Sequence, residues 1–149
     1  MGKTVAISVA RFSTVQTVAA FRAQGRSITA QRMAVFHAIE DADGHPTAEE
    51  IHTRLRDVVP RLALKTVYAI LHELAELGLL APIPLAVGAM RWESNTAPHG
   101  HLVCDACRRV VDLSVDPTVL MPLVRRAGRR FDVRGASLIV HGRCDRCAT

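Results

Sequence analysis

The sequence predicts an α+β chain made of two parts, and three observations carry this prediction. Residues 1–93 contain four helical patterns followed by a hairpin pattern. Residues 99–149 read as strand, helix and strand, with an antiparallel sheet expected, and they hold all four cysteines of the chain. Between the two parts, residues 94–98 (Ser-Asn-Thr-Ala-Pro) are small, polar and end in proline, which is typical of a hinge.

The first two helices are predicted from caps and apolar spacing. A helix over residues 14–24 is expected to bury one face, formed by Val15, Val18 and Phe21. Thr29 is a suitable cap for a second helix, from residue 30 to about residue 41.

The next two helices form a helix-turn-helix pattern. Residues 47–50 (Thr-Ala-Glu-Glu) fit a capping box, and the helix that follows is expected to end before Pro60, with an apolar face of Ile51, Leu55 and Val58. The fourth helix starts at Lys65 and stops at Gly78. Its polar face holds Lys65, Tyr68, Ala69, His72 and Glu76. Residues 79–85 and 89–93 then predict a hairpin, which would be a wing.

The second part is too short to be stable unaided. A strand is expected over residues 101–113, a helix from 117 to about 130, and a strand over 137–140. Roughly 50 residues bury too little apolar surface for an independent core. A metal ion or a second subunit is therefore expected to stabilise this part.

Charge is unevenly distributed along the chain. The net charge of +5 comes from +5 in residues 1–39, −4 in residues 40–93 and +4 in the remainder. A basic arm ahead of a polar-faced helix favours a polyanion such as DNA, although scattered arginines explain the charge equally well. The composition excludes a disordered or collagen-like chain. Neither a membrane span nor a signal peptide is recognisable, which predicts a cytoplasmic protein with no membrane partner.

The cysteines form two Cys-x-x-Cys pairs, Cys104 with Cys107 and Cys144 with Cys147, separated by 36 residues. Two such turns complete a closed four-sulfur zinc site. Redox pairs and free thiols are the alternatives, but a cytosolic setting disfavours stable disulfides. Because four protein ligands leave no open position, this Zn²⁺ would be structural.

Two histidines precede the first cysteine pair. His99 and His101 point to the same face of an extended strand, so one metal ion can take both imidazoles. The spacing alone is weak, since paired strand histidines are more often solvated. Asp112, expected on the same strand or its continuation, and Glu93 are by themselves more often surface carboxylates.

Several ordered motifs together resemble the ferric uptake regulator family of metal-sensing bacterial repressors. They are Thr29-Ala-Gln-Arg32, Thr66-Val-Tyr68-Ala-Ile-Leu71, Leu77-Gly-Leu79, Arg91-Trp-Glu93 and His99-x-His101-x-x-Cys104-x-x-Cys107. The resemblance implies a winged-helix DNA-binding domain over 1–93, a hinge over 94–98, and an α/β dimerisation and metal-binding domain over 99–149.

The resemblance also implies two metal sites. The structural zinc falls on the four cysteines, and the regulatory site falls on His45, Glu93, His99, His101 and Asp112. Imidazoles and carboxylates without thiolate suit Fe²⁺, Mn²⁺ or Zn²⁺ better than Cu⁺. A further site found in many family members is expected to be absent, because its ligand positions hold Pro98, Gly100, Val119 and Ala136.

The implied function is an Fe(II)-sensing repressor that binds operator DNA as a homodimer and catalyses no reaction. Glu93 is typical of iron sensors, whereas Asp112 is typical of the peroxide-sensing branch, which uses Fe(II)-driven histidine oxidation. That branch, and a zinc, nickel or manganese uptake regulator, are the alternatives within the family. The expected DNA contacts are Tyr68, Lys65, Arg32 and Arg26.

Two alternatives lie outside the family. A zinc hydrolase would need Glu93 as general base, but the chain has no His-Glu-x-x-His motif. A zinc-ribbon module that binds protein is disfavoured by the basic arm and by the polar face around Tyr68.

Overall fold

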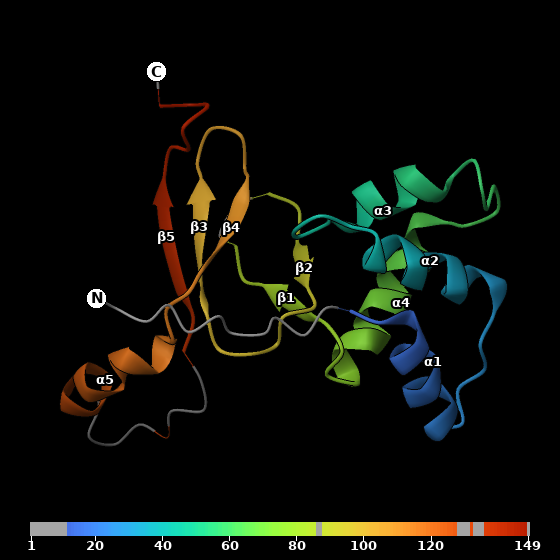
Figure 1. The fold of residues 1–149 in the computed structure, drawn as a ribbon, viewed down its shortest axis with the longest axis horizontal. Coiled ribbons are helices and arrows are strands. Elements are labelled where there is room, and N and C mark those ends of the chain that lie inside the picture. The colour runs from blue at the N-terminus through green and yellow to red at the C-terminus, as the bar shows by residue number, and fades with distance from the viewer. Residues whose placement is uncertain (1–11, 86–87, 128–131, 133–135, 149) are drawn as a thin grey trace, which may run out of the picture. The chain divides into compact units, whose positions relative to one another are not determined.

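The computed structural model describes residues 12–85, 88–127, 132 and 136–148, and the chain divides after Thr96 into two compact units. The first unit consists of α1 (Thr14–Ala23), α2 (Ala30–Glu40), α3 (Ala48–Leu55), α4 (Leu64–Glu76), β1 (Ala81–Ile83) and β2 (Arg91–Glu93) (Figure 1). The second consists of β3 (Gly100–Cys104), β4 (Val110–Leu113), the 3-10 helix η1 (Pro117–Leu120), α5 (Met121–Ala127) and β5 (Leu138–Gly142). The division falls within residues 94–98, whose role as a hinge stays a prediction. Lys3 and Arg11 of the expected basic arm lie outside the described residues.

Helix α1 is rotated relative to the predicted apolar face. Its buried residues are Thr14, Thr17 and Phe21, while Val15 is 79% exposed, so the prediction for Val15 is wrong. The Phe21 ring meets Phe36 of α2 edge-on, with ring centroids 5.1 Å apart. This aromatic contact buries the helix face that holds Thr14, Thr17 and Phe21. Burial of Thr17 costs little, because its hydroxyl donates to the Ser13 carbonyl at 2.8 Å.

Helix α3 begins as predicted and ends early. The capping box is confirmed, because Thr47 Oγ1 accepts from the Glu50 amide at 3.1 Å and the Glu50 carboxylate accepts from the Thr47 amide at 2.9 Å. The predicted extension to Pro60 is wrong, and Val58 is 73% exposed. The Leu55 carbonyl accepts from the amides of both Val58 and Val59, a tightened turn, and Pro60 disfavours a helical conformation in the residue before it.

Helix α4 and the hairpin complete a winged helix-turn-helix. Helix α4 buries Val67, Ile70, Leu71 and Leu74. Strands β1 and β2 pair antiparallel, with Ile83 opposite Arg91. The wing is joined to the helices through Trp92, which is 1% exposed and whose amide donates to the Pro46 carbonyl at 3.0 Å. Thr47 also forms an isolated antiparallel bridge with Arg91, so the residues just before α3 pair with β2.

The second unit is a three-stranded sheet in the order β4-β3-β5. The single strand predicted over 101–113 is wrong, because the chain reverses at the first cysteine pair, where Arg108 has a φ of 63°. The expected antiparallel pairing holds for β3 and β4, whereas β5 is parallel to β3. The reason is the crossover through η1 and α5, which brings the chain back on the other side of β3. Residues 128–131 of the predicted helix lie outside the described residues.

The second unit has a small core. Among its described residues, the buried apolar side chains are those of Val103 and Cys104. Leu102, Val111 and Val140 stand side by side in the register and share one face of the sheet, each at least 40% exposed. The described residues of this unit therefore form little core of their own, and its stabilisation by a metal ion or a second subunit stays a prediction. No helix within the described ranges is long and apolar enough to cross a bilayer.

Candidate metal centres and nucleic-acid interface

The four predicted cysteine ligands come together at one end of the sheet. Cys104 ends β3, and the turn holding Cys144 follows β5, which is parallel to β3 with Cys104 opposite Gly142. The four sulfur atoms lie within 4.8 Å of one another, and Cys107 Sγ and Cys144 Sγ are 3.7 Å apart. A tetrahedral site with Zn–S bonds of about 2.3 Å requires sulfur atoms about 3.8 Å apart. The cluster therefore fits Zn²⁺.

The thiols differ in how readily they ionise. Hydrogen bonds from the backbone amides of Cys107 and Cys144 lower the pKa of Cys104 to about 6. The pKa of Cys147 is raised to about 12, because its thiol hydrogen-bonds to Cys144 and Cys107 in the neutral form. The four thiols could ionise together only beside a cation, and a bound Zn²⁺ would supply that charge while releasing protons.

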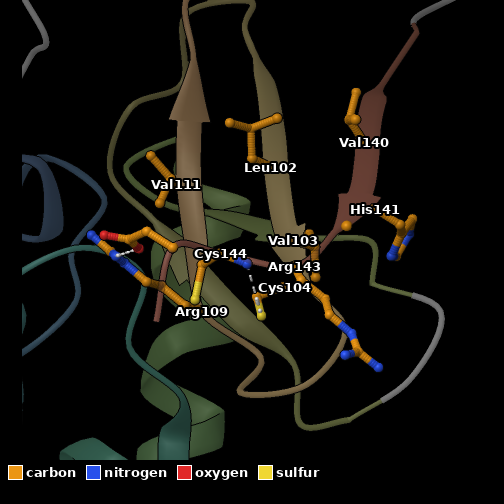
Figure 2. A pocket seen from close by; sticks show the side chains of 11 residues that line it. Leu102, Val103, Cys104, Arg109, Val111, Val140, His141, Arg143 and Cys144 are labelled. Carbon is orange, nitrogen blue, oxygen red and sulfur yellow. Dashed lines mark hydrogen bonds and ion pairs between the residues drawn. The ribbon is translucent and has the colours of Figure 1, made fainter. Parts of the chain in front are cut away.

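An open pocket of about 400 Å³ lies beside the cysteines. Figure 2 shows Cys104 and Cys144 at one end of it, with Leu102, Val111 and Val140 projecting from the three strands. Arg109 and Asp145 close one side with an ion pair at 3.6 Å. Its lining thus combines an apolar part, formed by residues of the three strands, with a polar part that also includes His141 and Arg143.

The second unit also positions three of the predicted regulatory ligands. His101 lies directly opposite Asp112 in the antiparallel register, so the hairpin, and not one continuous strand, brings them together. His99 Nε2 and His101 Nε2 lie 3.5 and 3.9 Å from Asp112 Oδ1. Ligand atoms bound to one ion through bonds of about 2.1 Å lie at most about 4.2 Å apart, so these distances fit a shared cation.

The tautomer of His99 is set by its backbone partner. Its Nδ1 lies 2.7 Å from the Ala97 carbonyl, which is only an acceptor, so Nδ1 carries the proton. The neutral imidazole then has its lone pair on Nε2, the atom that faces Asp112. A ring held through one nitrogen in this way is typical of a histidine that binds metal through the other.

The first unit positions the remaining two predicted ligands, His45 and Glu93. His45 precedes α3 and Glu93 ends β2, with His45 Nε2 3.8 Å from Glu93 Oε2. Arg91 Nη1 donates to the His45 carbonyl at 2.7 Å and lies 3.4 Å from Glu50 Oε2. Sequence reasoning placed Glu50 only in the capping box that starts at Thr47, and it assigned no role to Arg91. The available signal was the spacing of Arg91 and Glu93, which alternation along a strand puts on one face.

The polar face of α4 presents two of the predicted DNA contacts. Lys65 is exposed in the first turn. Tyr68 is half-buried, and its hydroxyl donates to Glu49 Oε1 at 2.7 Å. This hydrogen bond lowers the pKa of Glu49 and raises the pKa of Tyr68, because it favours the charged carboxylate and the neutral phenol. Sequence reasoning missed Glu49 as the residue that orients Tyr68.

The other two predicted DNA contacts make ion pairs with the C-terminal half of α4. Arg32 Nη2 donates to both carboxylate oxygens of Glu73 at 2.8 Å, and Arg26 Nη2 donates to Glu76 at 3.1 Å. The guanidinium carbons of Arg32 and Arg26 also lie 5.3 and 5.9 Å from the centroid of the Phe21 ring. Their contact with DNA stays a prediction, and it competes with these pairs.

Comparison with known proteins places these features in one family. The model of the ferric uptake regulator family matches residues 23–141. The peroxide-responsive repressor of Staphylococcus epidermidis is 26% identical over 132 residues, which cover 89% of this chain and 88% of that protein.

Solved structures share the fold. The ferric uptake regulator of Helicobacter pylori has a TM-score of 0.73 at 17% identity, over 93% of this chain and 97% of that one. The ferric uptake regulator of Vibrio cholerae has a TM-score of 0.68 at 25% identity, over 86% of this chain and 99% of that one. Members of the family are transcriptional regulators that bind DNA and metal ions and form dimers. The chain belongs to the ferric uptake regulator family, as the match of the family model over residues 23–141 shows.

Proposed function

We propose that this chain is a cytoplasmic repressor that binds operator DNA as a homodimer when a regulatory cation, Fe(II), is bound. One observation carries the proposal. The imidazole and carboxylate ligands occur as two sets, His45 with Glu93 in the first unit and His99, His101 and Asp112 in the second. Neither set fills a coordination sphere by itself.

The two sets explain how a cation would control DNA binding. His45 and Glu93 would bind from the first unit, and the other three ligands from the second, across the hinge of residues 94–98. The cation supplies one positive centre that both sets share. An arrangement of the units that satisfies both sets gains their combined binding energy, and about 5.5 kcal/mol moves a two-state population from 1:99 to 99:1.

The cysteine cluster would hold a separate, structural Zn²⁺. Because its four sulfur ligands close the coordination sphere, no position is left to activate water, and we propose no enzymatic activity. Two ions per chain are proposed in all, since the ligand positions of a further family site hold Pro98, Gly100, Val119 and Ala136.

Homodimer formation is supported by the uncovered face of the sheet in the second unit. Leu102, Val111 and Val140 line the pocket of Figure 2 and are each at least 40% exposed. A contiguous apolar face on a unit with few buried apolar residues is typical of a surface that a second subunit covers.

The proposed DNA contacts centre on α4. Tyr68 would contact a thymine methyl group or a phosphate, and Lys65 a phosphate. Arg26 and Arg32 are also proposed to reach phosphates, but each would first have to leave its ion pair with Glu76 or Glu73.

The alternative is a peroxide-sensing repressor. It is supported by Asp112 and by the similarity to the peroxide-responsive repressor of Staphylococcus epidermidis. Mass spectrometry of the Fe(II)-loaded protein after peroxide treatment decides between the two. One added oxygen on His45, His99 or His101 supports the peroxide sensor, whereas unmodified histidines support the iron sensor. Preferential activation by Zn(II), Ni(II) or Mn(II) would instead identify another metal regulator of this family.

The proposed function is tested by selecting duplexes from a random DNA library with the full chain in Mn(II), which is stable in air. Fluorescence anisotropy then measures the affinity for the selected duplex with Fe(II), Mn(II), Zn(II) or chelator. We expect salt-sensitive binding that requires a cation. Failure to select any duplex, or equal affinity in chelator, contradicts the proposal.

A further inference from the structure

We propose that Arg91 is a positioning residue that joins the His45–Glu93 ligand pair to the first turn of α3, so that cation binding at the pair is transmitted to the helix-turn-helix. This inference rests on the proposed function, because it assumes that His45 and Glu93 are ligands. It adds a route within the first unit to the effect of joining the two units.

Arg91 is placed on the same side of β2 as Glu93. The residue between them, Trp92, is 1% exposed and packs in the helical core, so alternation puts Arg91 and Glu93 on the opposite face. The Arg91 side chain is only 20% exposed, and its Nη1 donates to the His45 carbonyl at 2.7 Å. Arg91 therefore holds the backbone of the proposed ligand His45, and it lies two residues before the other proposed ligand, Glu93.

The same guanidinium reaches the start of α3. Arg91 Nη1 lies 3.4 Å from Glu50 Oε2, and this oxygen also accepts from the Thr47 amide at 2.9 Å. Glu50 is thus shared between the capping box and Arg91. A shift of the His45 backbone that moves Arg91 must disturb the capping box as well, since both interactions use one carboxylate oxygen.

The first turn of α3 leads directly to the proposed DNA surface. Glu49, the neighbour of Glu50, accepts the Tyr68 hydroxyl at 2.7 Å. A series of contacts thus joins His45 to Tyr68. Hydrogen bonds link His45 to Arg91 and Arg91 to Glu50, a peptide bond links Glu50 to Glu49, and a hydrogen bond links Glu49 to Tyr68. A shift at His45 should therefore reach Tyr68 through these contacts.

The test compares Arg91→Met with a matched control, Arg54→Met. Arg54 also donates from Nη1 to a backbone carbonyl, that of Ala38 at 3.3 Å, but it lies in the last turn of α3 and outside this network. Mn(II) affinity is measured on the zinc-loaded full chain by competition with a chelating dye. We expect Arg91→Met to weaken Mn(II) binding about 10- to 100-fold, the usual cost of losing a residue that supports a ligand, and Arg54→Met to leave it unchanged.

A second measurement follows amide hydrogen exchange in the first turn of α3 at saturating Mn(II). In the wild type, Mn(II) should slow exchange at Glu50 and Ile51, and in Arg91→Met it should not. Arg91→Lys keeps the positive charge but has a single donor group. It should give Mn(II) affinity and exchange rates between those of the wild type and Arg91→Met, and it replaces Arg91→Met in both measurements if that variant does not fold.

Two results overturn the inference. One is equal loss of Mn(II) affinity in Arg91→Met and Arg54→Met, which would reflect general destabilisation. The other is Mn(II)-dependent protection of α3 that survives in Arg91→Met. Both measurements are made without DNA, so failure of the Arg91 inference is distinct from failure of the chain to bind an operator.

Discussion

The two candidate metal centres are assembled in different ways. The four cysteines lie in turns at the same end of one sheet, and all belong to the second unit. The imidazole and carboxylate residues that we propose as regulatory ligands are divided between the two units, with two in one and three in the other. A site that one folding unit completes becomes part of that unit's stability. A site that needs two units instead makes ligand affinity depend on their arrangement, which is what a sensor requires.

The largest effect is expected from breaking the cysteine cluster. Cys104→Ser should abolish zinc binding and unfold or monomerise the second unit, because binding of a structural zinc contributes about 10–16 kcal/mol in zinc-finger peptides and this unit has a small core. Zinc content, size-exclusion chromatography and circular dichroism measure the outcome. A Cys104→Ser protein that stays a folded dimer without zinc would remove the structural role from this cluster.

Breaking the divided site should leave the fold intact. His99→Ala should weaken regulatory Mn(II) or Fe(II) binding by more than the 10- to 100-fold cost of losing a supporting residue, and it should abolish cation-dependent DNA binding. His37→Ala is the matched control, since His37 is 58% exposed in α2 and lies outside both clusters. Anisotropy, zinc content and chromatography separate the outcomes. If His99→Ala loses zinc and folding as Cys104→Ser does, the assignment of two separate sites is wrong.

A smaller effect distinguishes Arg32, which joins α2 to α4, from Lys65, which is proposed to contact DNA. Arg32→Met should lower the free energy of unfolding by about 1–2 kcal/mol, because it removes a two-oxygen contact with Glu73 from a half-buried setting. Lys65→Met should leave the free energy of unfolding unchanged. It should reduce the slope of log affinity for DNA against log salt concentration by about 1, the amount expected for one lost phosphate contact. Urea denaturation and salt titrations measure the two quantities. An equal loss of salt dependence in both variants would show that Arg32 leaves Glu73 to contact DNA.

The smallest effect concerns Tyr68. Tyr68→Phe should cost less than about 1 kcal/mol of stability, because its hydrogen bond to Glu49 is largely exposed. The lowered pKa of Glu49 means that this contribution is present above the ordinary pKa of a glutamate and is lost as the pH falls through the lowered value. Because the pKa of Tyr68 is raised, the contribution of this hydrogen bond to stability is also lost at the alkaline end, as the pH rises through that raised value. A stability difference between wild type and Tyr68→Phe that persists in acid would contradict this interpretation.

The features predicted from the sequence are those encoded by short spacings. The Thr47 capping box, the hairpin and the cysteine pairs each depend on residues a few positions apart. The pairing of Asp112 with His101 could not be read in this way, because it depends on where the chain reverses. The ion pairs of Arg26 and Arg32 join residues 50 and 41 positions apart. No local pattern specifies such contacts.

His45 shows a different limit. Its surroundings, residues 43–46 (Asp-Gly-His-Pro), read as an ordinary turn, and only the resemblance to a family identified it as a candidate ligand. The structure supplies the physical basis for that position, since its backbone is held by Arg91 and it faces Glu93. Arg91 itself had no assigned role, because a cation on a strand carries no signal until its acceptors are known.

We propose that a removable cation, separate from the structural zinc, controls DNA binding. The most direct measurement is the affinity of the full chain for its selected duplex before and after brief EDTA treatment that leaves one zinc ion per chain. We predict that binding is lost after treatment, while the protein stays folded, and that added Mn(II) restores it. Undiminished DNA binding by the EDTA-treated protein would contradict the account.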